Sequence, residues 1–238
     1  MKLLANILSL MLFVGVASAQ VADYKLNVQN FCELTVVDGI GVDYCCSTDS
    51  AGWAVFSCEP ATASRIMFSN KEEVLTIQTD ADEKAITNLP RIKVYSVSLR
   101  KVENSGDSTV CIHVTTPVKS FKAKQIGNGM LDIHGLDAGN VDASIMAGCG
   151  KLYIEGKTNK VTFKNVSSGP IKGSGLVASE VKCLMLGNGD IECKASDKLS
   201  IFGAGSGMVV YHSDPAKIVN RGIGVKAVRR QESDITSL

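Results

Sequence analysis

From about residue 125 onward, short segments of alternating apolar and polar residues are separated by glycine turns. Six of these turns begin successive repeats, which start 17 to 21 residues apart. A period of this length is too short for a propeller blade and is typical of one solenoid coil with loops of variable length. The repeats begin at Gly127, Gly148, Ser167, Gly187, Gly205 and Gly222.

Every second residue is apolar in the first segment of each repeat. This period of two predicts a strand with one buried face. The fifth residues of the six repeats are Leu131, Leu152, Ile171, Ile191, Val209 and Lys226. The seventh residues are Ile133, Ile154, Gly173, Cys193, Tyr211 and Val228. The mostly polar residues between them are Asp132, Tyr153, Lys172, Glu192, Val210 and Ala227.

A second strand is predicted in each coil, over residues 141–146, 161–163, 181–186, 199–202 and 218–219. Glycine is favoured at the corners because it reaches positive φ without steric cost and lets neighbouring coils approach. Equivalent residues of successive coils should therefore stack about 4.8 Å apart, the spacing of hydrogen-bonded strands.

The first half of the chain is also rich in β-forming residues, but it is less regular. Strands are predicted over residues 32–37, 41–46, 53–58, 65–68, 74–79, 92–99 and 108–114. No linker composition separates them from the repeats, so they are expected to begin the same stack and to cap its first coil. The prediction is an all-β chain in which residues 20–230 form one parallel β-solenoid, or single-stranded β-helix, irregular over 20–117 and regular over 118–230.

The N-terminus has the features of a secretory leader. Lys2 precedes an apolar run over residues 7–16, and the small residues Ala17, Ser18 and Ala19 follow. The run is shorter than the roughly 20 residues that span a bilayer, so cleavage between Ala19 and Gln20 is expected. No later apolar run is long enough to span a membrane, and residues 231–238 form a polar tail. The chain is thus predicted to be exported.

Charge and glycine patterns exclude two further classes of ligand. Without Lys2, the chain has 24 basic and 24 acidic residues, so it lacks the basic face of a nucleic-acid-binding protein. The glycine run at residues 203–207 is not followed by a predicted helix, so no phosphate loop or dinucleotide site is expected. No cofactor is predicted.

Eight cysteines follow the predicted leader. In an oxidising compartment they could pair, and the predicted strands 41–46 and 53–58 around a turn could place Cys45 or Cys46 opposite Cys58. We take Cys45 with Cys58 as the candidate disulfide. Several cysteines could instead be small buried apolar residues. No C-x-x-C motif or Cys/His cluster occurs, so no metal site is expected.

Asp190 and Glu192 are the best candidates for a catalytic pair of carboxylates, because they lie two residues apart on one predicted outer strand face. Their expected neighbours are Lys172, Met208 and Val210, with no histidine among them. His134 and His212 share a column but lie four coils apart, too far to act together. A solvated, charged strand face is the favoured interpretation.

The segments NFCELTVVDGIGVDY, EVLTIQT and GNGDIECKASDKLSIFGAGSGMVVYHSDPAKIVNRGIGVK resemble the head GIN domain family of auto-transporter adhesins. The resemblance covers roughly residues 28–230. It implies a β-helical fold in exported proteins of Gram-negative bacteria, and it supplies no catalytic residues. The chain departs from the repeat pattern at Ser167, Pro170 and Lys226.

These observations together predict an exported, non-catalytic, adhesin-like module that serves a binding or structural role at the bacterial cell envelope or surface. Its partner would be a surface ligand, either a glycan or a protein. The periplasm, the cell surface and the extracellular medium all remain open as its location. The alternative is a carbohydrate-active enzyme that uses Asp190 and Glu192 on a β-helix.

Overall fold

The structure is a computed structural model that describes residues 20–80 and 88–230. The predicted leader, its cleavage site after Ala19 and the polar tail 231–238 therefore lie outside the described residues. Within the described part, α1 (Pro60–Ala63) is the only helix, and no helix is long and apolar enough to cross a membrane.

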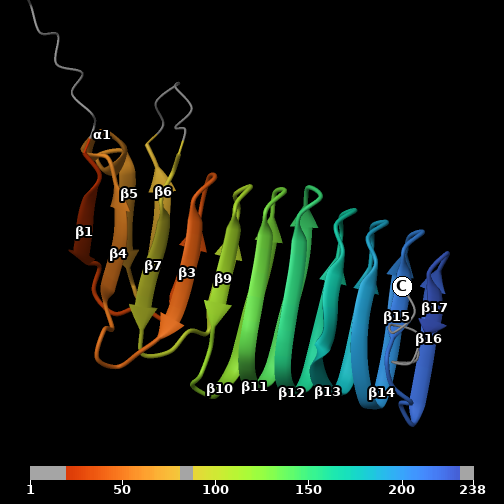
Figure 1. The fold of residues 1–238 in the computed structure, drawn as a ribbon. Helices are drawn as coiled ribbons and strands as arrows, with labels where there is room; N and C mark the ends of the chain where they lie inside the picture. Colours follow the sequence, from red (N-terminus) through yellow and green to blue (C-terminus); the bar gives the residue numbers. More distant parts are fainter. Residues whose placement is uncertain (1–19, 81–87, 231–238) are drawn as a thin grey trace, which may run out of the picture.

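Seventeen strands form one hydrogen-bonded network that is folded into two walls around a shared core (Figure 1). Four long strands bend so that their first residues belong to one wall and their last residues to the other. These strands are β11 (Met130–Ala147), β12 (Lys151–Asn165), β13 (Ile171–Met185) and β14 (Ile191–Ala204).

We call the two walls the front wall and the back wall. The front wall contains, in spatial order, β1 (Ala22–Asn27), β4 (Trp53–Cys58), β7 (Arg91–Ser96), β3 (Gly41–Cys46), β9 (Thr109–His113), the first parts of β11 to β14, β15 (Met208–Tyr211) and β17 (Lys226–Arg229). The back wall contains β5 (Ile66–Lys71), β6 (Val74–Thr79), β2 (Glu33–Val36), β8 (Lys101–Asn104), β10 (Val118–Ile126), the second parts of β11 to β14, and β16 (Lys217–Ile223).

The parallel solenoid predicted from the repeats is confirmed. Leu131 pairs in register with Leu152, and Ile171 pairs with Ile191, as the column alignment requires. All four side chains are fully buried, whereas Asp132, Tyr153, Lys172 and Glu192, which lie between the apolar columns, face outward and are only partly buried. The period of two therefore identified the buried face of these strands.

The predicted register of the last coil is wrong by one residue. Val209 pairs with Ala227, and Met208 pairs with Lys226, so Lys226 does not interrupt the apolar column. The reason is that the turn of this coil is built from a later glycine: a Cβ on Gly224, at φ +77°, would approach the Gly205 carbonyl oxygen at 2.6 Å.

Close approach between coils explains the glycine turns. Gly148 has φ +79°, a left-handed conformation that glycine adopts without steric cost. Gly169 lies so near the preceding coil that an added Cβ would be 1.8 Å from the Gly150 carbonyl oxygen. The turns thus require glycine for space as well as for conformation.

In the core, small side chains of one wall lie opposite large side chains of the other. A Cβ on Gly173 of the front wall would be 2.4 Å from the Phe163 ring of the back wall, so the absent side chain makes room for the phenyl group. One coil further along both walls, the register places Cys193 and Cys183, whose thiols are hydrogen-bonded to each other. This hydrogen bond, together with burial, raises the pKa of Cys183 well above its ordinary value.

The first strands join the stack as expected, but not in chain order. The coil formed by β2 and β3 lies between the coil of β6 and β7 and the coil of β8 and β9. The outermost pairings, β1 with β4, β4 with β7 and β5 with β6, are antiparallel. Strands β1, β8 and β10 were not predicted as strands from the sequence.

Three stacked aromatic rings cover the N-terminal end of the core. The Tyr24 and Phe56 ring centroids are 5.1 Å apart, and those of Phe56 and Phe68 are 5.9 Å apart. Tyr24 and Phe68 are partly buried and pack against the core together with Phe56, at the end of the stack that was expected to carry a cap.

The predicted hairpin of strands 41–46 and 53–58 is wrong. Strand β7 lies between β3 and β4, so Cys45 pairs with Tyr95 and His113 while Cys58 pairs with Ala22. Both cysteines are free thiols in the structure. The intervening strand comes from a segment more than thirty residues later in the chain, which a local turn signal cannot reveal.

Candidate ligand-binding face

The outer face of the front wall carries one continuous row of side chains from β1 to β17. Each member is the registered neighbour of the next, so the row crosses the strands at the usual spacing of about 4.8 Å. In order, the row contains Lys25, Val55, Lys93, Asp43, Cys111, Asp132, Tyr153, Lys172, Glu192, Val210 and Val228. Charged, aromatic and apolar groups therefore share one rigid surface.

A shallow hollow of about 260 Å³ lies in the middle of this face, and we call it the central hollow. Its polar lining combines three carboxylates, an imidazole, an ammonium, a phenol and a hydroxyl. The lining residues that carry these groups are Asp132, His134, Tyr153, Glu155, Lys172, Ser174 and Glu192. Such a set can bind the hydroxyl, amide or charged groups of a ligand in several orientations.

His134 is held between two carboxylates. Its Nδ1 lies 2.8 Å from Glu155 Oε1, and its Nε2 lies 3.0 Å from Asp132 Oδ1. The hydrogen bond to Glu155 is the main reason why the pKa of His134 is raised, with a further contribution from Asp132. Both ring nitrogens can donate only in the imidazolium form, so this geometry favours a positive charge.

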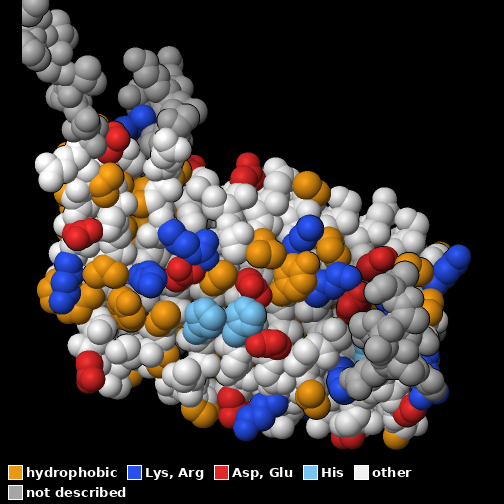
Figure 2. Space-filling model, viewed as in Figure 1, with side chains coloured by type: hydrophobic (Ala, Val, Ile, Leu, Met, Phe, Trp, Pro, Cys, Tyr) orange, Lys and Arg blue, Asp and Glu red, His pale blue; other side chains and the backbone are white. Residues whose placement is uncertain are grey.

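A second histidine, His113, stacks on His134 with ring centroids 5.3 Å apart and an interplanar angle of 16°. Figure 2 shows two adjacent histidines in the middle of the face, surrounded by charged and apolar side chains. His113 could not be recognised as this neighbour from the repeats, because the first aligned repeat begins at Gly127. The dipeptide Ile-His at 112–113 and again at 133–134, one coil apart, is the signal that would have revealed it.

Asp190 and Glu192 have the strand neighbours that the alignment predicted, but their surroundings differ in one respect. Asp190 Oδ1 accepts a hydrogen bond of 2.7 Å from the Met208 backbone N–H, and Glu192 forms an ion pair with Lys172. The expectation that no histidine lies nearby is wrong, since His212 Nε2 is 4.0 Å from Glu192 Oε2.

His212 lies close to Glu192 because the two residues occupy neighbouring coils, in adjacent rows of the front wall. Its side chain is 8% exposed, and its Nε2 has no hydrogen-bond partner in the described part of the chain. The structure thus brings a histidine to one of the two carboxylates proposed from the sequence. It does not place His134 beside His212.

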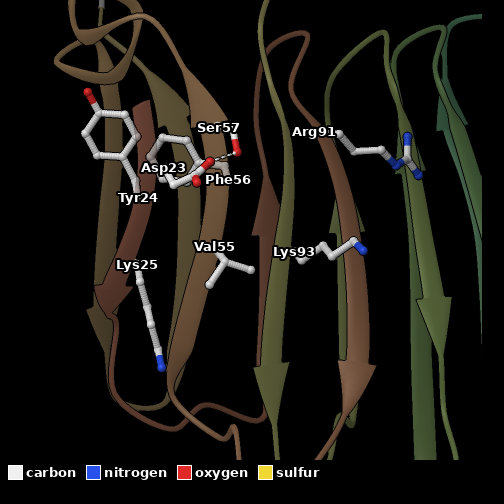
Figure 3. Close-up of a pocket in the computed structure, with 8 residues that line it drawn as sticks. All are labelled: Asp23, Tyr24, Lys25, Val55, Phe56, Ser57, Arg91 and Lys93. Atoms are coloured by element: carbon white, nitrogen blue, oxygen red, sulfur yellow. Dashed lines mark hydrogen bonds between the residues drawn. The ribbon is translucent and has the colours of Figure 1, made fainter. Parts of the chain in front are cut away.

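A larger hollow of about 520 Å³ lies at the N-terminal end of the same face, and we call it the N-terminal hollow (Figure 3). Strands β1, β4 and β7 supply its lining, which contains three basic side chains and one acidic side chain. The lining residues are Asp23, Tyr24, Lys25, Val55, Phe56, Ser57, Arg91 and Lys93. None of them was singled out from the sequence, because the three strands come from distant segments.

Arg91 connects this hollow with the rest of the front wall. Its Nε donates a hydrogen bond of 2.8 Å to Asp43 Oδ2, and this contact is the main reason why the pKa of Arg91 is raised. Arg91 also contacts Cys111, whose pKa is raised mainly by burial. A chain of contacts therefore links the N-terminal hollow to the row of the central hollow.

The front wall does not assemble a metal centre from its described residues. Across residues 20–80 and 88–230, no three His, Cys, Asp or Glu side chains are grouped so that they could hold a metal ion. The chemistry that these side chains offer is therefore hydrogen bonding, ion pairing and contact with apolar or aromatic surfaces.

Known structures share this fold. One is described as a putative adhesin from Bacteroides fragilis NCTC 9343: it is 19% identical, with a TM-score of 0.77, and the match covers 90% of this chain and 98% of that chain. Another is named a putative lipid binding protein from Parabacteroides distasonis ATCC 8503: it is 19% identical, with a TM-score of 0.67, and the match covers 88% and 96%. At these identities the likeness establishes the fold alone.

A search of the curated proteins gave no match. A family model does match the chain, over residues 30–215, and its description is "Putative auto-transporter adhesin, head GIN domain". The matched segment contains every strand from β2 to β15 and the whole central hollow. The chain therefore belongs to the head GIN domain family of auto-transporter adhesins.

Proposed function

We propose that the protein is an exported, non-catalytic binding module that holds a surface ligand, glycan or protein, on the outer face of its front wall. The observation that carries the proposal is the continuous outward row from Lys25 to Glu192, with a hollow at each end of its polar part. Ligand sites are concave, with a few polar groups at fixed positions on a rigid scaffold, and hydrogen-bonded strands supply that rigidity.

Export is proposed from the leader pattern at residues 1–19 and from membership in a family described as adhesins. The protein would then act in the periplasm, at the cell surface or outside the cell. A solenoid suits each of these compartments, because its core is built from the apolar side chains of the chain itself.

The partners of the candidate catalytic groups support a binding role. Asp190 is engaged by the Met208 backbone and Glu192 by Lys172, so both carboxylates have intramolecular partners. A glycosidase needs one carboxyl group as an acid and the other as a base or nucleophile, on either side of the scissile bond. The alternative remains a carbohydrate-active enzyme based on Asp190 and Glu192, now with His212 beside Glu192.

The proposal is tested by binding to an array of glycans, surface proteins and lipid vesicles, with two matched variants. Tyr153→Ala removes an aromatic group from the central hollow, and Phe202→Ala removes one from the outer face of the back wall. Tyr153→Ala should weaken ligand binding about tenfold or more, because buried aromatic anchors dominate binding energies. Phe202→Ala should leave binding unchanged, and melting curves confirm that both variants fold.

The same array separates the two functions. Products of cleavage that disappear in Glu192→Gln, with the fold retained, would establish the enzyme. Loss of binding in Phe202→Ala but not in Tyr153→Ala would place the ligand on the back wall and contradict the proposal.

A further inference from the structure

We propose that the N-terminal hollow binds an anionic glycan, whose carboxylate or sulfate groups pair with Lys25 and Lys93 and whose sugar ring between them lies on Val55. This inference rests on the proposed function, because it assigns a ligand class to part of the same front wall. It draws on the charges, the apolar floor and the polar margin of the hollow.

Two ammonium groups stand on either side of an apolar residue. Lys25 pairs in register with Val55, and Val55 pairs with Lys93, so the two lysines are two strand spacings apart, about 10 Å. Arg91 is neutralised by Asp43, whereas no described carboxylate forms an ion pair with Lys25 or Lys93. The hollow therefore presents two positive charges without an ion-pair partner, at a spacing that suits acidic groups on different sugars of one glycan chain.

One of the two lysines is held in place by an aromatic ring. Lys25 Nζ lies 4.5 Å from the centroid of the Trp53 ring, the geometry of a cation–π contact. This contact limits the rotamers of Lys25 without using its hydrogen-bond donors. The ammonium is thus positioned in advance for an incoming acidic group, which reduces the entropy lost on binding.

The floor and the margin of the hollow match the rest of a sugar. Val55 is partly exposed and offers an apolar surface to the C–H face of a ring. Two residues further along the same strands, Ser57 Oγ donates a hydrogen bond of 2.6 Å to Asp23 Oδ1. This pair can still accept hydrogen bonds from sugar hydroxyls, while the negative charge of Asp23 directs the acidic group toward the lysines.

The position of the hollow disfavours an acyl chain. Phe56, one of the lining residues drawn in Figure 3, has an exposed fraction of 6% and fills the core behind Val55. A lipid tail would need an enclosed apolar cavity, but here the core is already packed. An acidic peptide could satisfy the two lysines, but it would lack the ring that covers Val55.

The test measures the affinity of the full chain for four probes: oligogalacturonate, sulfated dextran, neutral dextran of similar length, and poly-glutamate. At least one of the two anionic glycans should bind at least tenfold more tightly than neutral dextran and poly-glutamate, and added salt should weaken its binding. The two anionic probes distinguish a carboxylate from a sulfate ligand. Lys25→Gln and Lys93→Gln should each weaken this binding about two- to fivefold, the range of an exposed ion pair.

Lys182→Gln is the matched control, because Lys182 is an exposed lysine of the back wall that lies over Phe202 at 5.5 Å. The inference would be overturned if neutral dextran bound as tightly as the anionic glycans, or if poly-glutamate bound more tightly than they do. It would also be overturned if Lys182→Gln lowered the affinity for the anionic glycan as much as Lys93→Gln does. If a neutral glycan binds and only Tyr153→Ala abolishes its binding, the proposed function stands and this inference fails. If no probe or array ligand depends on either hollow, both fail.

Discussion

His134 shows how a single residue couples two coils of the front wall to pH. It bridges Asp132 on its own strand and Glu155 on the next coil, and this geometry raises its pKa above the ordinary value of 6.5. Stabilisation by a group with a raised folded-state pKa is fully present below the unfolded pKa and is lost as pH rises through the folded pKa.

We therefore predict that His134→Gln lowers the free energy of unfolding more at pH 5.5 than at pH 8.5. The difference between the two pH values should be below about 1 kcal/mol, because the side chain is 37% exposed and solvent screens the ion pairs. Urea unfolding of the wild type and the variant at both pH values measures it. In Glu155→Gln, the pKa of His134 should fall toward its ordinary value, and an NMR titration with no such change would refute this account.

Individual outward residues could be predicted from the sequence only where the repeat frame reached them. Asp132, Tyr153, Lys172 and Glu192 were placed on one face because glycine turns fixed their register. His113, Lys25 and Lys93 were not, since no glycine repeat marks the strands that carry them. The hydrophobic pattern fixes which face a strand buries, but it does not identify which strand lies alongside.

At the scale of the coil, the turns limit how closely neighbouring strands can stack. We predict that Gly169→Ala lowers the free energy of unfolding by about 3 kcal/mol, because its Cβ would collide with the Gly150 carbonyl oxygen at 1.8 Å. The melting temperature should fall by about 6 to 12 °C for a chain of this size.

Gly39→Ala is the matched control for that prediction, because a Cβ at Gly39 would have no heavy atom within 4 Å. Its effect should stay within about 1 kcal/mol and could be stabilising, since alanine restricts the unfolded chain. Similar losses in the two variants, measured by thermal unfolding, would mean that the contacts between turns do not limit the stack.

The strands of the C-terminal half could be predicted from local pattern, and the strand order of the N-terminal half could not. Successive coils after residue 125 pair with partners about 20 residues away, so one repeating signal describes them all. Strand β2 pairs instead with β6 on one side and β8 on the other. Its residue Glu33, for example, lies between Val74 and Lys101. Strand pairings over such long sequence separations produce no repeat in the sequence. The hairpin predicted for Cys45 and Cys58 was wrong for this reason.

Across the whole molecule, the early and the late coils of the chain differ in how many neighbouring coils they are hydrogen-bonded to. The coil of β2 and β3 is hydrogen-bonded on both sides to segments that come later in the chain, whereas β16 and β17 are each bonded to one neighbouring coil within the described residues. A solenoid whose coils follow chain order would have no such difference.

The clamped coil of β2 and β3 should make the response of the stack to mechanical load depend on the end that is pulled. Tension applied at the C-terminal end can detach the coils in succession, because each outer strand is held by a single ladder of hydrogen bonds that breaks at low force. Tension applied at the N-terminal end first removes β1, which pairs only with β4, and then reaches the coil of β2 and β3, where two ladders must break together. Single-molecule pulling from β17 is expected to give a series of small steps, and pulling from β2 one large rupture at higher force; equal rupture forces from both ends would contradict the clamp.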